Sequence, residues 1–293
     1  MKCFYHNDLD GRCAGFWVSL SAGIDNLDHP RNFIEIDYKD SFPIDNILPH
    51  EQIYIVDYSI EPEMMEKLLS ITHNVTWIDH HKTAIEKYKD FPYTIRGIRY
   101  DGISGAMLTY CYLHHMTNRG VGDIKQFSVD MVTEAPLMTK LVSDWDVFKF
   151  EYGDKTRQFQ AGSISLDLNP GSGSWVSLMH NGYVDDICNK GNTIIKYRDM
   201  WAADYVGNLG FAVEIEGYNC WAVNLGRCNS EYFKGIPGPD IYVPFVFDGK
   251  KYTVSLYSTT VDVSVIAKKY GGGGHKGASG FVCLELPFRK AND

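Results

Sequence analysis

The chain has 293 residues, of which 44% are hydrophobic and 22% are charged, and its formal net charge is −9. This composition is typical of a folded protein and excludes a disordered chain. The negative charge argues against a broad basic surface of the kind that tracks long duplex nucleic acid. At this length, two domains are favoured over one.

The first half alternates strand-like and helix-like segments. Strands are expected within 2–6, 32–38, 52–58, 75–81 and 94–100, and helices within 11–23, 61–73 and 104–116. Pro62 stands in the first turn of the second of these helices, where its missing N–H is harmless. Alternation of this kind predicts βαβ units with a doubly wound, mainly parallel sheet, and therefore an α/β domain.

The second half has a different pattern. A helical stretch from about 127 to 150, with Pro136 as its start or kink, is followed by a Gly, Ser and Pro-rich loop or linker at 169–177. A helix at about 184–205 then leads to several strands, and Asp248-Gly249 is a typical hairpin turn between two of them. We therefore expect a catalytic domain at 1–170, a linker and connecting helix at 171–207, and a smaller mixed-sheet α+β domain at 208–293.

The cysteines and the lengths of the apolar runs indicate the cellular compartment of the protein. The seven cysteines contain no C-x-x-C pair, and an odd number does not favour a closed disulfide framework. No run approaches the roughly 18 apolar residues that cross a bilayer, and the chain begins with a strand-like segment rather than a signal sequence. These features predict a cytoplasmic protein without a membrane partner.

Acidic residues and histidines follow three of the predicted strands. Asp8 and Asp10 follow the first strand, Asp57 ends another, and Asp79, His80 and His81 end a third. Ligands of open parallel sheets gather beyond the carboxyl ends of the strands, so these groups should converge. A single Asp after a strand is more often a helix cap, but three strand ends with the same pattern favour a site.

Converging carboxylates repel one another unless protons or cations lie between them. Carboxylate and imidazole without thiolate suit Mn²⁺, with Mg²⁺, Co²⁺ or Fe²⁺ as possible substitutes. Five or six ligands exceed what one catalytic ion needs and point to two ions, which activate water and clamp phosphate oxygens. The prediction from the residues is therefore a two-metal site.

Five motifs occur in one order along nearly the whole chain: HNDLDG at 6–11, IVD at 55–57, IDHH at 78–81, SDWDVF at 143–148 and GGGGHKGASG at 271–280. This set resembles the DHH phosphoesterase superfamily. The last motif resembles the associated C-terminal substrate domain found with oligoribonucleases, phosphoadenosine-phosphate phosphatases, cyclic-dinucleotide phosphodiesterases and single-strand exonucleases. It differs from the C-terminal domain of the related inorganic pyrophosphatases.

The resemblance implies a ligand set. His6 and Asp8 would hold one Mn²⁺, Asp10 and His80 the other, and Asp57 would bridge them. The fourth motif would supply one more carboxylate. Members with a D-x-x-x-aromatic pattern have this ligand at the first Asp, which implies Asp144 ahead of Phe148 here, with Asp146 as the alternative. Asp57, His80 and His81 are the expected catalytic residues, and Asp79 would orient a metal-bound imidazole.

The resemblance also implies a substrate-binding segment across an interdomain cleft. Consecutive glycines let backbone N–H groups cradle an anionic oxygen, although a glycine run alone is more often a flexible turn. Tyr257 stands where many relatives have a phosphate-binding Arg, so a Tyr that stacks on a base or donates one hydrogen bond is expected there. The candidate substrate-binding residues are His81, Arg99, Tyr257, Gly272, Gly273, Gly274 and His275.

The predicted activity is hydrolysis of phosphodiester bonds in short oligonucleotides or small nucleotides. Cyclic-nucleotide phosphodiesterase, phosphoadenosine-phosphate phosphatase and exopolyphosphatase activities stay open as alternatives, as does a non-catalytic nucleotide sensor on the same scaffold. The expected partners are these small substrates and, for the protein itself, a second copy in a homodimer.

Overall fold

The computed structural model describes residues 1–23, 31–119, 129–233 and 237–288, apart from the side chains of 115–131. The chain divides into two compact units, Met1–Thr193 and Ile194–Asp293, and the division falls within one long helix, α9 (Asn181–Leu209). Among the described residues, none of the helices combines the length and apolar character that crossing a bilayer requires.

The first unit contains a parallel sheet of order β2-β1-β3-β4. Its strands are β1 (Lys2–His6), β2 (Phe33–Ile36), β3 (Ile53–Val56) and β4 (Val75–Ile78). The segment at 94–100, expected as a further strand, contributes isolated bridges from Thr76 to Arg96 and from Asp79 to Arg99. The predicted α/β class is confirmed.

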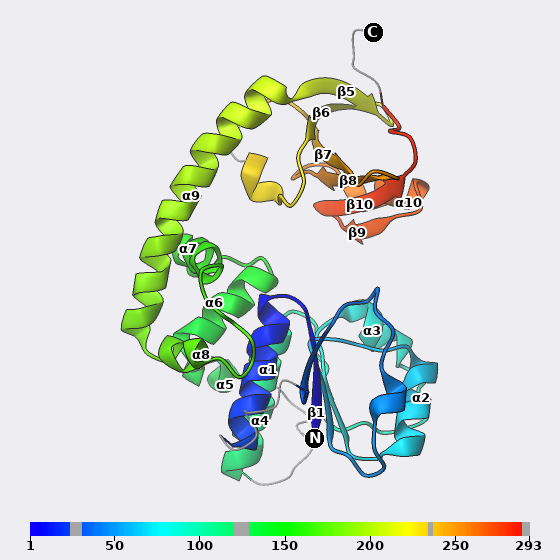
Figure 1. The fold of residues 1–293 in the computed structure, drawn as a ribbon, viewed down its shortest axis with the longest axis vertical. Coiled ribbons are helices and arrows are strands. Elements are labelled where there is room, and N and C mark those ends of the chain that lie inside the picture. The colour runs from blue at the N-terminus through cyan, green and yellow to red at the C-terminus, as the bar shows by residue number, and fades with distance from the viewer. Residues whose placement is uncertain (24–30, 120–128, 234–236, 289–293) are drawn as a thin grey trace. The chain divides into compact units, whose positions relative to one another are not determined.

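Helices cover both faces of this sheet (Figure 1). On one face lie α1 (Leu9–Ala22), α4 (Gly105–Arg119) and α6 (Leu137–Asp146), and on the other lies α2 (Pro62–Ile71). Successive strand residues alternate between the two cores: Cys3 and Tyr5 pack with α1, whereas Phe4 packs with α2. The sheet is therefore doubly wound and buried on both faces.

The remaining helices of this unit are short. They are η2 (Ile44–Asn46), α3 (Lys82–Lys87), α5 (Val129–Glu134), α7 (Asp154–Ser163) and α8 (Gly173–Leu178). Pro136 is the N-cap of α6, as the sequence indicated. The loop expected at 169–177 is partly wrong, because α8 begins at Gly173 after the cap Ser172 and buries Trp175 completely.

The second unit has a mixed sheet of order β5-β6-β7-β8-β10-β9, in which β6 and β7 run parallel and the other neighbouring strands run antiparallel. Its elements after α9 are β5 (Phe211–Ile215), β6 (Tyr218–Asn224), η3 (Ser230–Phe233), β7 (Ile241–Phe247), β8 (Tyr252–Tyr257), α10 (Val263–Lys269), β9 (Gly273–His275) and β10 (Ala278–Cys283). The helix α10 packs on one face. The predicted α+β mixed sheet is confirmed, as is the Asp248-Gly249 turn, where Gly249 has a φ of 97°.

Candidate metal centre

The carboxyl ends of β1, β3 and β4 meet at one edge of the first sheet, because the three strands are parallel neighbours. Their donor atoms form three overlapping groups, in each of which one ligand atom per residue lies within 4.8 Å of the others. The groups are His6, Asp8 and Asp57; Asp57, His80 and His81; and Asp10, His80 and Asp146. The convergence expected from the topology therefore occurs.

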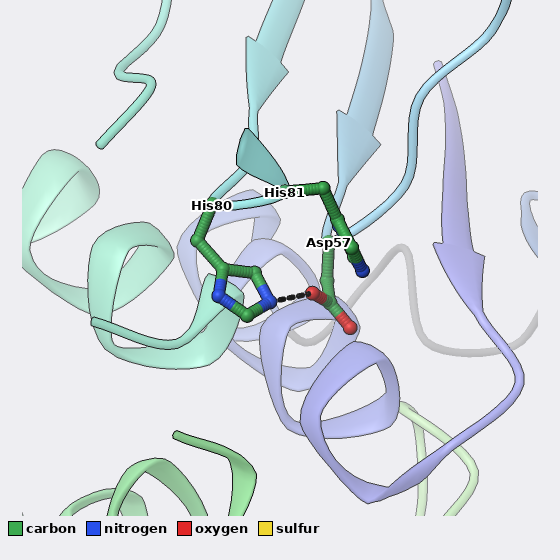
Figure 2. Close-up of side chains that lie close together, drawn as sticks. All are labelled: Asp57, His80 and His81. Atoms are coloured by element: carbon green, nitrogen blue, oxygen red, sulfur yellow. Dashed lines mark ion pairs between the residues drawn. The ribbon is translucent and has the colours of Figure 1, made fainter. Parts of the chain in front are cut away.

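Asp57 lies at the centre of these groups. It follows β3 directly, has a positive φ of 52° and exposes 1% of its surface. Its Oδ1 lies 3.2 Å from Nε2 of His80 yet makes no hydrogen bond, and Figure 2 shows both imidazoles turned towards this carboxylate. Burial, followed by the charges of Asp10 and Asp8, raises the pKa of Asp57 well above its ordinary value.

Asp10 is tied to the N-terminus of α4. Its Oδ2 accepts a hydrogen bond of 2.7 Å from the Gly105 amide, and its Oδ1 accepts one of 3.1 Å from the Ala106 amide. Ser104 caps the same helix through the Met107 amide. At Gly105 a Cβ would lie 2.5 Å from Cβ of Asp57, so only glycine lets α4 approach this closely. No sequence pattern identified Gly105 as part of the site.

Asp8 has two roles. Its Oδ1 accepts a hydrogen bond of 2.8 Å from the Gly11 amide and so caps α1, while its Oδ2 lies 2.6 Å from Nδ1 of His6. Asp8 therefore caps α1 and also lies in one of the three groups of potential ligands. Burial lowers the pKa of His6, but the hydrogen bond and charge of Asp8 outweigh it and the net change is upward.

His80 and His81 differ in their partners. Asp79, fully buried, accepts hydrogen bonds through Oδ1 from the backbone amides of both histidines and lies 2.7 Å from Nδ1 of His81. Burial lowers the pKa of His80. Burial also lowers the pKa of His81, but the hydrogen bond and the charge of Asp79 outweigh it, so the pKa of His81 is raised overall. Asp79 thus orients His81, not His80.

The fourth motif brings Asp146 to the cluster and leaves Asp144 outside it. Oδ2 of Asp146 is buried, makes no hydrogen bond and lies 3.4 Å from Nε2 of His80. The oxygens of Asp144 accept hydrogen bonds from the Glu151 amide at 2.7 Å, the Tyr152 amide at 3.2 Å and the Thr156 hydroxyl. Asp144 therefore holds the turn into α7, and the alternative considered for this motif fits the geometry.

The cluster as a whole suits cations. Burial raises the pKa of Asp57 and of Asp146 well above their ordinary values, and the charges of Asp10 and Asp8 add to both shifts. Without cations, these carboxylates repel one another in a site that water reaches poorly. Buried carboxylate oxygens without hydrogen bonds, next to imidazole nitrogens, form a donor set that divalent cations satisfy.

Comparison with known proteins finds similar sequences and a similar fold. No family model matches the sequence. The chain is 24% identical to oligoribonuclease NrnB of Bacillus subtilis, over 94% of this chain and 71% of that protein. It is 21% identical to an uncharacterized protein of Acanthamoeba polyphaga mimivirus, over 83% of this chain, and spans 57% of that protein. The pGpG-specific phosphodiesterase PggH from Vibrio cholerae has a similar fold, with a TM-score of 0.52 and 13% identity over 97% of this chain and 94% of that one.

The ordered motifs and the two-unit fold now agree. The chain is similar to the DHH superfamily in its ordered motifs, in its sequence relative and in its fold. At the identities found, the similarity to the solved structure concerns the fold alone. The cluster at the sheet edge is accordingly the place where the DHH motif lies in this chain, since Asp79, His80 and His81 contribute to it together.

Two other candidate substrate-binding residues are engaged elsewhere. The Arg99 guanidinium donates to the backbone carbonyls of Trp77, Arg96 and Ile95 and lies 5.3 Å from the ring centroid of Trp77. The Tyr257 hydroxyl donates to the Cys228 carbonyl at 2.9 Å. Both side chains contribute to the fold through these bonds, so a role in holding phosphate has no support from their hydrogen bonding.

The glycine motif forms an exposed hairpin in the second unit. Gly273, Gly274 and His275 make up β9, which pairs with β10. A Cβ at Gly272 would lie 2.1 Å from the Gly280 carbonyl oxygen, and Gly274 has a φ of 138°. Glycine is thus required for the hairpin itself, whatever it binds. The imidazole of His275 is exposed, and its role in binding substrate stays a prediction.

Asparagine variants at the two acidic positions of the fourth motif test their assignment. Asp146→Asn should reduce Mn²⁺ affinity by more than about 10-fold with little loss of stability, because it removes a repelling charge. Asp144→Asn should bind Mn²⁺ when folded but lose about 1–3 kcal/mol of stability, since an amide cannot accept from all three donors. Calorimetric titration with Mn²⁺ and thermal melting of both variants measure this. Normal Mn²⁺ affinity in Asp146→Asn would return the choice to Asp144.

Proposed function

We propose that the protein is a metal-dependent phosphoesterase that hydrolyses phosphodiester bonds of short oligonucleotides or small nucleotides. The observation that carries this proposal is the unbonded, buried Oδ1 of Asp57, surrounded by carboxylates and imidazoles from three strand ends. The names of oligoribonuclease NrnB and of the pGpG-specific phosphodiesterase PggH favour a nucleotide substrate.

The proposed ligands of two divalent cations are His6, Asp8, Asp10, Asp57, His80 and Asp146. Asp146 replaces Asp144, which the family resemblance had implied as a ligand. Asp57 belongs to two of the three groups and is the proposed bridge. When bound, the cations supply Lewis-acid activation of water and of the phosphate oxygens. Mn²⁺ is the proposed native ion, because the donors are carboxylates and imidazoles without thiolate.

His81 is the proposed proton donor to the leaving oxygen. Asp79 lies 2.7 Å from its Nδ1 and fixes the ring, which leaves Nε2 available to a substrate. The net effect on His81 is a raised pKa, which favours the protonated form that a general acid needs. The backbone amides of Gly105 and Ala106 hold Asp10 in place during this step.

Substrate selection is assigned to the second unit. In the hairpin of Gly272, Gly273, Gly274 and His275, the last three residues are exposed, and glycine backbone beside an imidazole suits a phosphate oxygen. The sequence resemblance is the support for this part of the proposal.

A substrate panel tests the proposed function. With Mn²⁺, the protein should hydrolyse a dinucleotide faster than a 20-residue oligonucleotide, and chelation of the metal should stop the reaction until Mn²⁺ is restored. A cyclic dinucleotide, phosphoadenosine phosphate and polyphosphate complete the panel and distinguish the alternative activities. A Mn²⁺-loaded protein that is inert on every substrate but binds nucleotides would instead be a nucleotide sensor.

A further inference from the structure

An exposed aromatic ring borders the candidate metal centre. Tyr38 lies two residues after β2 and exposes 51% of its surface. Its ring centroid is 5.6 Å from that of His6 and 5.9 Å from that of His81. Ligands gather beyond the carboxyl ends of parallel strands, and Tyr38 lies beyond that end of β2 as the proposed metal ligands lie beyond those of β1 and β3.

The ring is held in place from several sides. The buried Tyr58 lies behind it, with ring centroids 5.0 Å apart. The turn that carries Tyr38 is closed by the Asp37 amide, which donates to Asp40 at 2.9 Å. The same turn is tied to the loop between β1 and α1 by Asn7, whose amide donates to Asp37 at 3.2 Å. Tyr38 is therefore an ordered ring beside a proposed metal ligand, His6, and the proposed proton donor, His81.

Single exposed tyrosines are common on protein surfaces and need no function. Tyr38 differs because it adjoins a cluster that suits phosphate chemistry. An inorganic phosphate chain has no aromatic or apolar group that could pack on a flat, uncharged ring beside the phosphate site. A nucleotide, in contrast, carries a base one sugar away from its phosphate, and bases stack on aromatic rings with little dependence on sequence.

We propose that Tyr38 is a stacking platform for a base of the substrate, so that the site prefers nucleotides to polyphosphate. This inference rests on the proposed phosphoesterase function and specifies its substrate class. The ring, not the hydroxyl, is the recognising group.

The test compares three variants on a matched pair of substrates. Tyr38→Ala removes the ring, and Tyr38→Phe keeps the ring without the hydroxyl. Tyr93→Ala is the control: this ring is 55% exposed but precedes Arg96, which pairs with Thr76 near the start of β4 and hence near the opposite edge of the sheet. The substrates are a dinucleotide and the same compound with abasic sugars at both positions, hydrolysed in the presence of Mn²⁺.

Tyr38→Ala should lower kcat/KM for the dinucleotide about 5- to 100-fold, mainly through KM, and leave the abasic compound unaffected. Tyr38→Phe and Tyr93→Ala should match the unmodified protein. Equal losses on both substrates would overturn the proposal and make Tyr38 a support for the histidines. Equal kcat/KM values for the two substrates in the unmodified protein would also overturn it, while leaving the phosphoesterase function intact.

A binding measurement separates this inference from the activity. Calorimetric titration of the Mn²⁺-loaded protein with AMP should show weaker binding by Tyr38→Ala, with Mn²⁺ content and melting temperature unchanged. If the unmodified protein hydrolyses neither substrate, the proposed function fails, and this titration still tests the platform. AMP binding of equal strength in both proteins would refute it.

Discussion

Replacing Asp57 with asparagine is expected to abolish hydrolysis and, without metal, to stabilise the protein at neutral pH. The loss of activity should exceed the roughly 100-fold that removal of an outer-shell partner costs, because Asp57 is the proposed bridge between the ions. Asparagine is the appropriate replacement, since Asp57 has a φ of 52° and asparagine tolerates this conformation better than alanine. The backbone should therefore stay in place.

The stability effect depends on pH with a defined sign. The pKa of Asp57 is raised in the folded protein, above its unfolded value, by burial and then by Asp10 and Asp8. Its contribution to stability is thus fully present below the unfolded pKa and is lost as the pH rises through the folded pKa. Asparagine does not ionise, so the advantage of the variant should grow with pH and reach about 1–3 kcal/mol.

Thermal melting between pH 4 and pH 8, with chelator and with Mn²⁺, measures both effects. With Mn²⁺ the order should reverse, because the unmodified protein gains about 2.7 kcal/mol at a metal concentration of 100 Kd and the variant gains far less. The exposed Asp90→Asn serves as control and should change neither quantity. An Asp57→Asn protein that is fully active and binds two ions would refute the bridging role.

Much of the site was predictable because it follows from strand direction. Parallel strands deliver their carboxyl ends to one edge, so His6, Asp57 and His80 had to approach one another once the alternation of strands and helices was recognised. Neighbouring residues of a strand face opposite sides of the sheet, so the buried residues of each strand divide between the two hydrophobic cores.

The choice between Asp144 and Asp146 was not available from the sequence. Both lie at the end of α6, and residues two positions apart on a helix point about 200° apart around its axis. Which of them faces the cluster depends on the rotation of the helix against α1 and α4. Long-range packing sets that rotation, through buried residues such as Met138 and Leu141.

Tertiary packing also explains α8, a helix that the local amino-acid composition did not predict. Glycine and serine around 171–174 indicated a loop, yet Trp175 is fully buried and stacks on Phe16 with ring centroids 5.5 Å apart. Its indole N–H donates to the Leu168 carbonyl at 3.2 Å. Burial of one large ring offsets the weak helix propensity of its neighbours, and no local pattern announces such a contact.

Gly105→Ala is expected to lower activity about 100-fold or more, although alanine is the better helix former. An added Cβ would lie 2.6 Å from Oδ1 of Asp57, so either Asp57 or the N-terminus of α4 must move. The Gly105 amide also donates to Asp10 at 2.7 Å, so that both carboxylates are displaced together. Misplacement of reacting groups by about 1 Å is enough for a loss of this size.

The matched control is Gly207→Ala in α9, where nothing lies within 4 Å of the added Cβ. There the same substitution should leave activity unchanged and raise stability by up to about 1 kcal/mol, because alanine costs less backbone entropy in a helix. Mn²⁺ titration, steady-state kinetics and thermal melting of the two variants distinguish a clash with Asp57 from the general effect of replacing a helical glycine with alanine. If Gly105→Ala were as active as Gly207→Ala, the contact between α4 and Asp57 would not constrain the metal centre.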